Sequence, residues 1–166
     1  ANHRISDLNA AVGVAQLRKL DWILDVQRRN TAAITAAMAA IPGIDFRQLP
    51  DPDGDSATFL SFFMPDLETA RQAVKALAAA GVDGCFHWYD NKWHYIRKWN
   101  HFHTMQVAAR LPVQTLSNCP DYSSIAMPGS DAIMQRAISM QIKLGWTPEQ
   151  LDQRIQATVK ALKTFK

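Results

Sequence analysis

The chain has 166 residues, 48% of them apolar and 20% charged, which suits one globular domain with a hydrophobic core and excludes a disordered chain. Its 18 basic residues are scattered among 15 acidic ones, so the sequence lacks the basic stripe of a nucleic-acid-binding protein. No apolar run approaches the ~20 residues that a membrane span requires, and we expect neither nucleic acid nor a membrane as a partner.

The first predicted element is helical and unusually long. Ser6 is a good N-cap residue, and the stretch from Leu8 to Met38 contains no proline and a single glycine. Its apolar residues recur at helical spacing, which predicts either one long helix or two helices with a bend between them. Residues 1–40 are therefore expected to form a connecting helical segment, and residues 41–166 a small domain.

The first half of this small domain is expected to alternate between strands and a helix. Residues 44–57 predict a short strand and a turn, and residues 59–64 predict a buried strand. Asp66 is expected to cap a helix that runs to about Ala80 and stops at a glycine. Another strand is predicted over residues 85–89.

The second half is predicted to be less regular. A short helix is expected within residues 96–105, followed by mostly irregular chain. Ser130 is expected to cap a short helix that runs through Ala137. Apolar residues alternate along residues 138–144, which predicts a half-buried strand.

The last helix has the clearest start signal in the chain. Thr147 offers an N-cap hydroxyl, Pro148 suits the first helical position, and Gln150 occupies the capping-box position of a helix that runs to about Lys163. The order of elements predicts an α/β (α+β) fold, in which a long helix precedes a small, mostly antiparallel or mixed sheet covered by helices.

The densest group of candidate binding residues is the aromatic stretch of residues 86–99, which holds three of the five tryptophans. Aromatic rings suit the apolar C–H faces of a sugar, and neighbouring amides, imidazoles and a lysine suit its hydroxyl groups or a carboxylate. The alternative is a surface loop held by buried aromatic side chains. The candidate substrate-binding residues are His87, Trp88, Tyr89, Asn91, Lys92, Trp93 and His94.

Asn2 and Arg4 stand directly before the first helix. An amide, a guanidinium and the N–H groups of a helix start are able to hold a phosphate or a carboxylate. The alternative is an ordinary capping segment.

Metal binding is not expected, although four histidines fall between residues 87 and 103. His101 and His103 would share a face only on a strand, and zinc would also need further ligands at geometric spacing. Cys85 and Cys119 match neither a disulfide framework nor a metal-binding pattern, so we expect reduced thiols in a cytoplasmic protein.

The opening segment, residues 2–17, resembles a hallmark of the DegT/DnrJ-type sugar aminotransferases, roughly Asn-x-Arg-(Met/Ile)-Ser-(Asp/Glu) followed by Ala-Ala-x-Gly-x-x-Gln-Leu. The resemblance extends through the whole chain and implies the C-terminal domain of a homodimeric, pyridoxal-5'-phosphate (PLP) enzyme of fold type I. It implies that Asn2 reaches the cofactor phosphate of the other subunit. Arg4 would help to hold an anionic group of the cofactor or substrate.

The Schiff-base lysine of this family precedes the matching region, and no lysine here fits its motif. The resemblance thus implies the C-terminal part of a transaminase, without a catalytic residue of its own and inactive alone. This chain differs from the family members that use nucleotide-linked keto sugars, because it has Trp88 and Trp93 and no proline between them.

This departure favours a free, acidic eight-carbon sugar as amino acceptor. A narrower resemblance within the family, over residues 49–56 and 81–95, implies the same acceptor, glutamate as donor and a product used in lipopolysaccharide. Lys92, Arg97 or Lys98 would meet the sugar carboxylate. Two alternatives stay open: a nucleotide-sugar aminotransferase of the same family, and a non-catalytic sugar-binding module.

Overall fold

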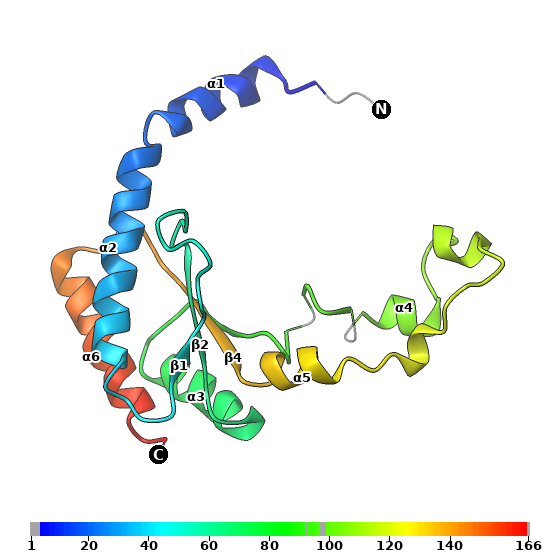
Figure 1. Ribbon diagram of the computed structural model, residues 1–166. Helices are drawn as coiled ribbons and strands as arrows, with labels where there is room; N and C mark the ends of the chain where they lie inside the picture. Colours follow the sequence, from blue (N-terminus) through cyan, green and yellow to red (C-terminus); the bar gives the residue numbers. More distant parts are fainter. Residues whose placement is uncertain (1–3, 92, 97–98, 166) are drawn as a thin grey trace.

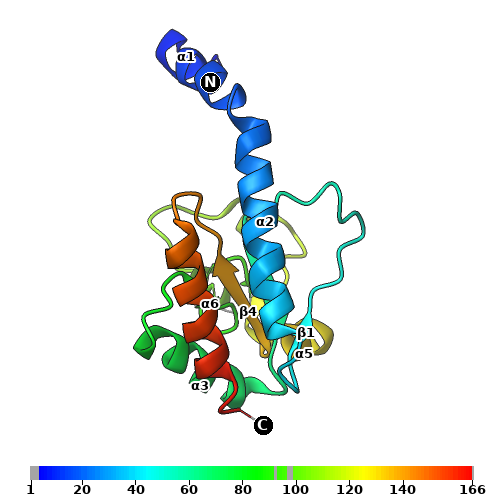
Figure 2. The same cartoon turned by 90° about the vertical axis from the view of Figure 1, so that its left-hand side faces the viewer.

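The computed structural model in Figure 1 describes residues 4–91, 93–96 and 99–165. Its first part consists of two helices, α1 (Asp7–Leu17) and α2 (Leu20–Met38). Between them the Lys19 N–H donates to the Gln16 carbonyl at 3.0 Å, a tighter turn than the α-helical pattern, so the chain bends there. The predicted helical stretch is therefore two helices, with α1 projecting away from the remainder of the chain (Figures 1 and 2).

Four short strands form one antiparallel sheet in the order β1-β2-β4-β3. The strands are β1 (Asp45–Phe46), β2 (Phe59–Phe63), β3 (Cys85–His87) and β4 (Ala137–Gln141). The prediction of a small antiparallel sheet is confirmed. β3 ends two residues before the predicted end of its strand, because the chain turns after His87.

The prediction that the strand after residue 137 is half-buried was wrong. β4 lies between β2 and β3, and its first four residues are all buried. Ser139 shows the reason: it faces away from the helices, yet a ring from the aromatic stretch covers it and leaves it 2% exposed. The strand also ends at Gln141 rather than at residue 144.

Three helices cover one face of the sheet: α2, α3 (Leu67–Ala79) and α6 (Pro148–Leu162), as Figure 2 shows. The predicted caps of α3 and α6 are confirmed. The Asp66 carboxylate accepts from the Thr69 N–H at 2.8 Å, and Thr147 and Gln150 form a capping box. The core between helices and sheet includes Ile34, Met38, Leu60, Phe62, Leu77, Ile138, Met140 and Leu162.

The chain between β3 and β4 extends away from the sheet (Figure 1). It contains α4 (Asn100–Thr104), two 3₁₀ turns, η2 (Pro112–Thr115) and η3 (Tyr122–Ser124), and α5 (Pro128–Met134).

The start of α5 was predicted wrongly. Met127, not Ser130, is its N-cap residue. Pro128 suits the first helical position, because the N–H group that proline lacks would have no partner within the helix there. Ala137 belongs to β4, where it pairs with Phe63, so the helix ends earlier than expected. Within the described parts of the chain, no helix combines the length and apolar character needed to cross a membrane.

Candidate functional site

The aromatic stretch begins on β3, an edge strand of the sheet, and strand alternation separates its side chains. Phe86 pairs with Ser139 and His87 pairs with Ile138, which belongs to the core under the helices. Successive side chains of a strand point to opposite faces. His87 therefore faces the helices, whereas Phe86 faces the opposite side of the sheet, called here the open face.

On the open face, five rings form a continuous series that we call the aromatic row. Neighbouring ring centroids are 6.4 Å apart for Phe59 and Phe86, 6.3 Å for Phe86 and Trp88, 6.0 Å for Trp88 and His94, and 6.3 Å for Trp93 and His94. The outermost ring, Trp93, is 65% exposed. The row thus presents a large apolar surface beside polar atoms of the same loop.

Within this row, the Trp88 ring is held in place by a hydrogen bond to the sheet. Its indole Nε1–H donates to Ser139 Oγ at 2.6 Å, and Ser139 Oγ is in turn 2.7 Å from Ser61 Oγ on β2. The indole ring is thereby held against the two central strands. His94, its neighbour in the row, has a backbone φ of 56°, a conformation that is uncommon outside glycine.

His87 lies on the other side of the sheet and is only 7% exposed. Its Nε2 is 2.9 Å from the Gln135 carbonyl oxygen and its Nδ1 is 3.1 Å from Asp90 Oδ2. Both ring nitrogens therefore have partners within the chain, and the ring lies on the opposite face of the sheet from the aromatic row.

Asp90 is also bound by Arg71 of α3. The Arg71 Nε and Nη2 groups donate to the two carboxylate oxygens, each at 2.8 Å, in a bidentate pair. The Arg71 hydrogen bonds, followed by that from His87, lower the pKa of Asp90 to about 2. Asp90 is accordingly ionised at neutral pH.

The remaining predicted residues lie in the turns after β3. The Asn91 N–H donates to the His87 carbonyl at 3.0 Å, and Asn91 Oδ1 accepts from the Trp93 N–H at 3.0 Å. The Tyr89 ring lies 6.2 Å from that of Tyr95, whose hydroxyl donates to Asp131 of α5. Lys92, Arg97 and Lys98 lie outside the described residues.

A cavity of about 400 Å³ opens next to the aromatic row. Its lining is mostly apolar and aromatic and consists of His94, Tyr95, Ile96, Trp99, Met127, Ser130, Ile133 and Met134. His94 belongs to both the row and the cavity, so the two surfaces are continuous. Such a cavity with a few polar groups is typical of a small-molecule site.

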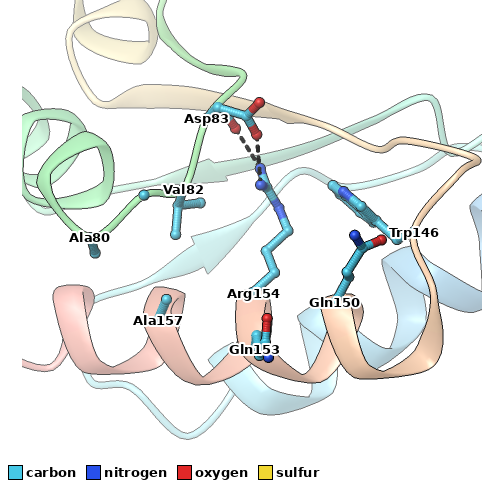
Figure 3. A pocket seen from close by; sticks show the side chains of 9 residues that line it. Ala80, Val82, Asp83, Trp146, Gln150, Gln153, Arg154 and Ala157 are labelled. Carbon is cyan, nitrogen blue, oxygen red and sulfur yellow. Dashed lines mark hydrogen bonds and ion pairs between the residues drawn. The ribbon is translucent and has the colours of Figure 1, made fainter.

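A second cavity, of about 360 Å³, lies at the opposite end of β3 (Figure 3). Arg154 of α6 is 8% exposed there, stacks 4.6 Å from the Trp146 ring centroid and donates to Asp83 Oδ1 at 2.9 Å. Asp83 also pairs with Lys143, and these two hydrogen-bonding cations lower the pKa of Asp83. Because the Arg154 charge is already compensated, we assign this pair to holding the start of β3.

The start of α1 is the second candidate site. Ser6 caps the helix by accepting from the Asn9 N–H at 3.2 Å, and Arg4 is exposed just before it. A guanidinium beside the N–H groups of a helix start fits a phosphate or carboxylate. Asn2 lies outside the described residues.

The surface of α1 is unusually apolar. Leu8, Val12 and Leu17 are 75%, 53% and 69% exposed, and no residue of α1 is buried by the described parts of the chain. Exposed apolar surface of this kind is typical of helices that pack against other protein.

Sequence reasoning missed the partners that hold the loop: Arg71, Asp90, Gln135 and Ser139. Arg71 precedes Asp90 by 19 residues and Ser139 follows Trp88 by 51, so no local pattern pairs them. Among the described residues, no three His, Cys, Asp or Glu side chains are placed to hold a metal ion.

Three solved structures share this fold. The aminotransferase TlmJ from Streptoalloteichus hindustanus has a TM-score of 0.68 and 16% sequence identity, and the match covers 99% of this chain and 38% of that chain. For 3-amino-5-hydroxybenzoic acid synthase the TM-score is 0.65 and the identity 20%, with 98% of this chain and 40% of that chain covered. For AtS13 from Actinomadura melliaura the TM-score is 0.61 and the identity 19%, with 97% of this chain and 35% of that chain covered. The chain thus spans no more than 40% of the length of any of the three. At these identities the likeness establishes the fold.

The family is established by a separate match. Residues 1–160 fit the model of the DegT/DnrJ/EryC1/StrS aminotransferase family, which covers almost the whole chain and includes both the start of α1 and the aromatic stretch. The likeness to aminotransferase structures agrees with this match. The chain therefore belongs to the DegT/DnrJ/EryC1/StrS aminotransferase family.

Proposed function

We propose that the full-length protein is a PLP-dependent transaminase that moves an amino group from glutamate to the C8 aldehyde of an oxidised 3-deoxy-manno-octulosonate. The product is 8-amino-3,8-dideoxy-manno-octulosonate, for use in lipopolysaccharide. The reaction class follows from the family, whose members are PLP-dependent sugar aminotransferases. The acceptor rests on the resemblance of residues 49–56 and 81–95 to 8-amino-3,8-dideoxy-manno-octulosonate transaminase.

The observation that supports a sugar as the amino acceptor is the aromatic row. Trp88, fixed by Ser139, and the exposed Trp93 offer rings on which the C–H face of a sugar packs. The row adjoins a cavity of about 400 Å³, which is a suitable size for a small molecule.

We assign substrate binding to Trp88, Tyr89, Asn91, Lys92, Trp93 and His94. His87 also belonged to the predicted set, but its ring nitrogens bond to Asp90 and Gln135, so we assign it to supporting the loop. Lys92, Arg97 or Lys98 would neutralise the sugar carboxylate.

The cofactor contact is assigned to the start of α1. When bound, PLP supplies the electron sink for transamination. Asn2 would bind its phosphate in the partner subunit of a homodimer, and Arg4 would hold an anionic group of the cofactor or substrate. The exposed apolar side chains of α1 support a contact with other protein at this place.

In that cytoplasmic homodimer, residues 1–40 would connect the domains and residues 41–166 would form the small domain. The Schiff-base lysine would come from the part of the enzyme before this chain. The chain alone is therefore proposed to be inactive.

The direct test supplies full-length enzyme with PLP, glutamate and the C8 aldehyde of the oxidised sugar acid. Mass spectrometry should detect the 8-amino sugar. Absence of that product, together with turnover of a nucleotide-linked 4-keto sugar, would replace the proposed acceptor by the second candidate, a nucleotide-sugar aminotransferase. That enzyme would also be inhibited by a nucleoside diphosphate.

The cofactor role is tested separately by Asn2→Ala in the full-length protein. Loss of one hydrogen bond to a charged group costs roughly 1.5–3 kcal/mol, so PLP should dissociate more readily while the fold persists. Asn9→Ala, within α1, is the matched control and should retain PLP. Unchanged PLP affinity of the Asn2 variant would contradict the cross-dimer contact.

A further inference from the structure

The loop that carries the aromatic row has little support from the sheet itself. β3 is an edge strand, and only its three residues pair with β4. After His87 the chain turns away, and the Trp88 N–H reaches the Ala137 carbonyl only at 3.4 Å. Strand pairing therefore contributes little support to residues 88–91, 93 and 94.

A chain of hydrogen bonds on the helix side of the sheet supplies this support. Arg71 of α3 holds both Asp90 oxygens at 2.8 Å, Asp90 Oδ2 is 3.1 Å from His87 Nδ1, and His87 Nε2 is 2.9 Å from the Gln135 oxygen. Gln135 is the C-cap residue of α5. The series thus ties α3, the loop and α5 together.

The chemistry of the partners determines which atom donates. The Gln135 carbonyl only accepts, so His87 Nε2 must carry a proton. An ionised Asp90 also only accepts, so the Nδ1 contact is a hydrogen bond when that nitrogen carries a proton too. The two hydrogen bonds between the Arg71 guanidinium and the ionised Asp90 carboxylate are charge-assisted and therefore stronger than neutral ones.

We propose that Arg71, Asp90 and His87 are positioning residues that set the aromatic row for the sugar without touching it. His87 and Trp88 are adjacent and point to opposite faces, so holding the imidazole on the helix side orients the indole on the open face. Asp90 similarly fixes the turn that leads to Asn91 and Trp93. This inference rests on the proposed function of the row in sugar binding.

The test uses Arg71→Met in the full-length holoenzyme, because Arg71 is partly exposed and its loss opens no core cavity. Losing a charge-assisted contact should raise KM for the sugar about tenfold. The kcat and the half-reaction with glutamate should stay unchanged, since neither uses the row. Lys75→Met, which removes a cation from the next turn of α3, is the matched control.

A double-variant cycle tests whether the pair acts as one unit. Arg71→Met and Asp90→Asn should each raise the sugar KM, and the two together should raise it no more than either alone. Arg71→Lys should restore only part of the affinity, because lysine lacks the planar fork that fits a carboxylate. Independent, multiplicative effects of the two substitutions would overturn the proposal.

A readout without turnover separates this inference from the proposed function. In protein labelled with 5-fluorotryptophan, the ¹⁹F resonance of Trp88, assigned with Trp88→Phe, should shift or broaden in Arg71→Met and remain unchanged in Lys75→Met. An unchanged Trp88 resonance or a parallel loss of the glutamate half-reaction would overturn the positioning role. Wild-type enzyme that aminates no sugar would refute the proposed function, while the resonance would still decide whether Arg71 positions Trp88.

Discussion

Trp88 and His87, adjacent in the chain, are bonded on opposite faces of the same sheet. The Trp88 indole donates to Ser139 on the open face, and the His87 ring bonds to Gln135 and Asp90 on the helix side. One loop thus has two structurally different sides: the open face, to which we assign ligand binding, and the helix side, where hydrogen bonds support the loop.

Removing the indole hydrogen bond should weaken the loop. Trp88→Phe keeps an aromatic ring but leaves Ser139 Oγ without the Nε1–H donor at 2.6 Å. The expected loss is about 0.5–1.5 kcal/mol of unfolding free energy, measured by urea denaturation of the full-length protein. Trp93→Phe, at a residue that is 65% exposed, is the control and should leave stability unchanged. Equal stability of both variants would contradict the role of the indole N–H.

The core under the helices should depend strongly on Phe62. Its side chain is 0% exposed, and Phe62→Ala should cost about 3–5 kcal/mol, measured by chemical denaturation. Phe59 is in the same strand but is 38% exposed, so Phe59→Ala should cost less than half as much. A similar loss in both variants would mean that the open face is as deeply covered as the core.

The pair between Arg71 and Asp90 predicts a specific acid dependence. The pKa of Asp90 is lowered to about 2, against ~3.9 in an unfolded chain. The stabilisation is therefore fully present above pH ~4 and is lost as pH falls through about 2. The unfolding free energies of wild type and Asp90→Asn, measured from pH 6 downward, should converge below pH 4. A constant difference across this range would contradict the ion pair.

The two cysteines should differ in reactivity. Burial raises the pKa of the Cys85 thiol to about 11, so little of the nucleophilic thiolate is present at pH 7.5. Cys119 is exposed, and iodoacetamide should label it first. Peptide mass spectrometry should find Cys85 labelled only after unfolding, and Cys119→Ser should show almost no labelling while folded. Rapid labelling of Cys85 would show that the start of β3 opens readily.

Local sequence chemistry was sufficient for three helix starts, although not for that of α5. Ser6, Asp66 and Thr147 cap α1, α3 and α6 as predicted, because each side chain bonds a backbone N–H only three residues ahead. The family motif of residues 2–17 is equally local, and the match over residues 1–160 agrees with it.

The contacts between segments that are distant in the sequence were decided only by the tertiary structure. The burial of β4 depends on its central place in the sheet, and the support of the loop depends on Arg71, 19 residues before Asp90. The tertiary structure also decided that His87 lies on the helix side of the sheet while Trp88 lies on the open face. Capping involves neighbours in sequence, whereas strand order and side-chain pairing appear only when the chain brings remote residues together, and no local pattern encodes which residues those are.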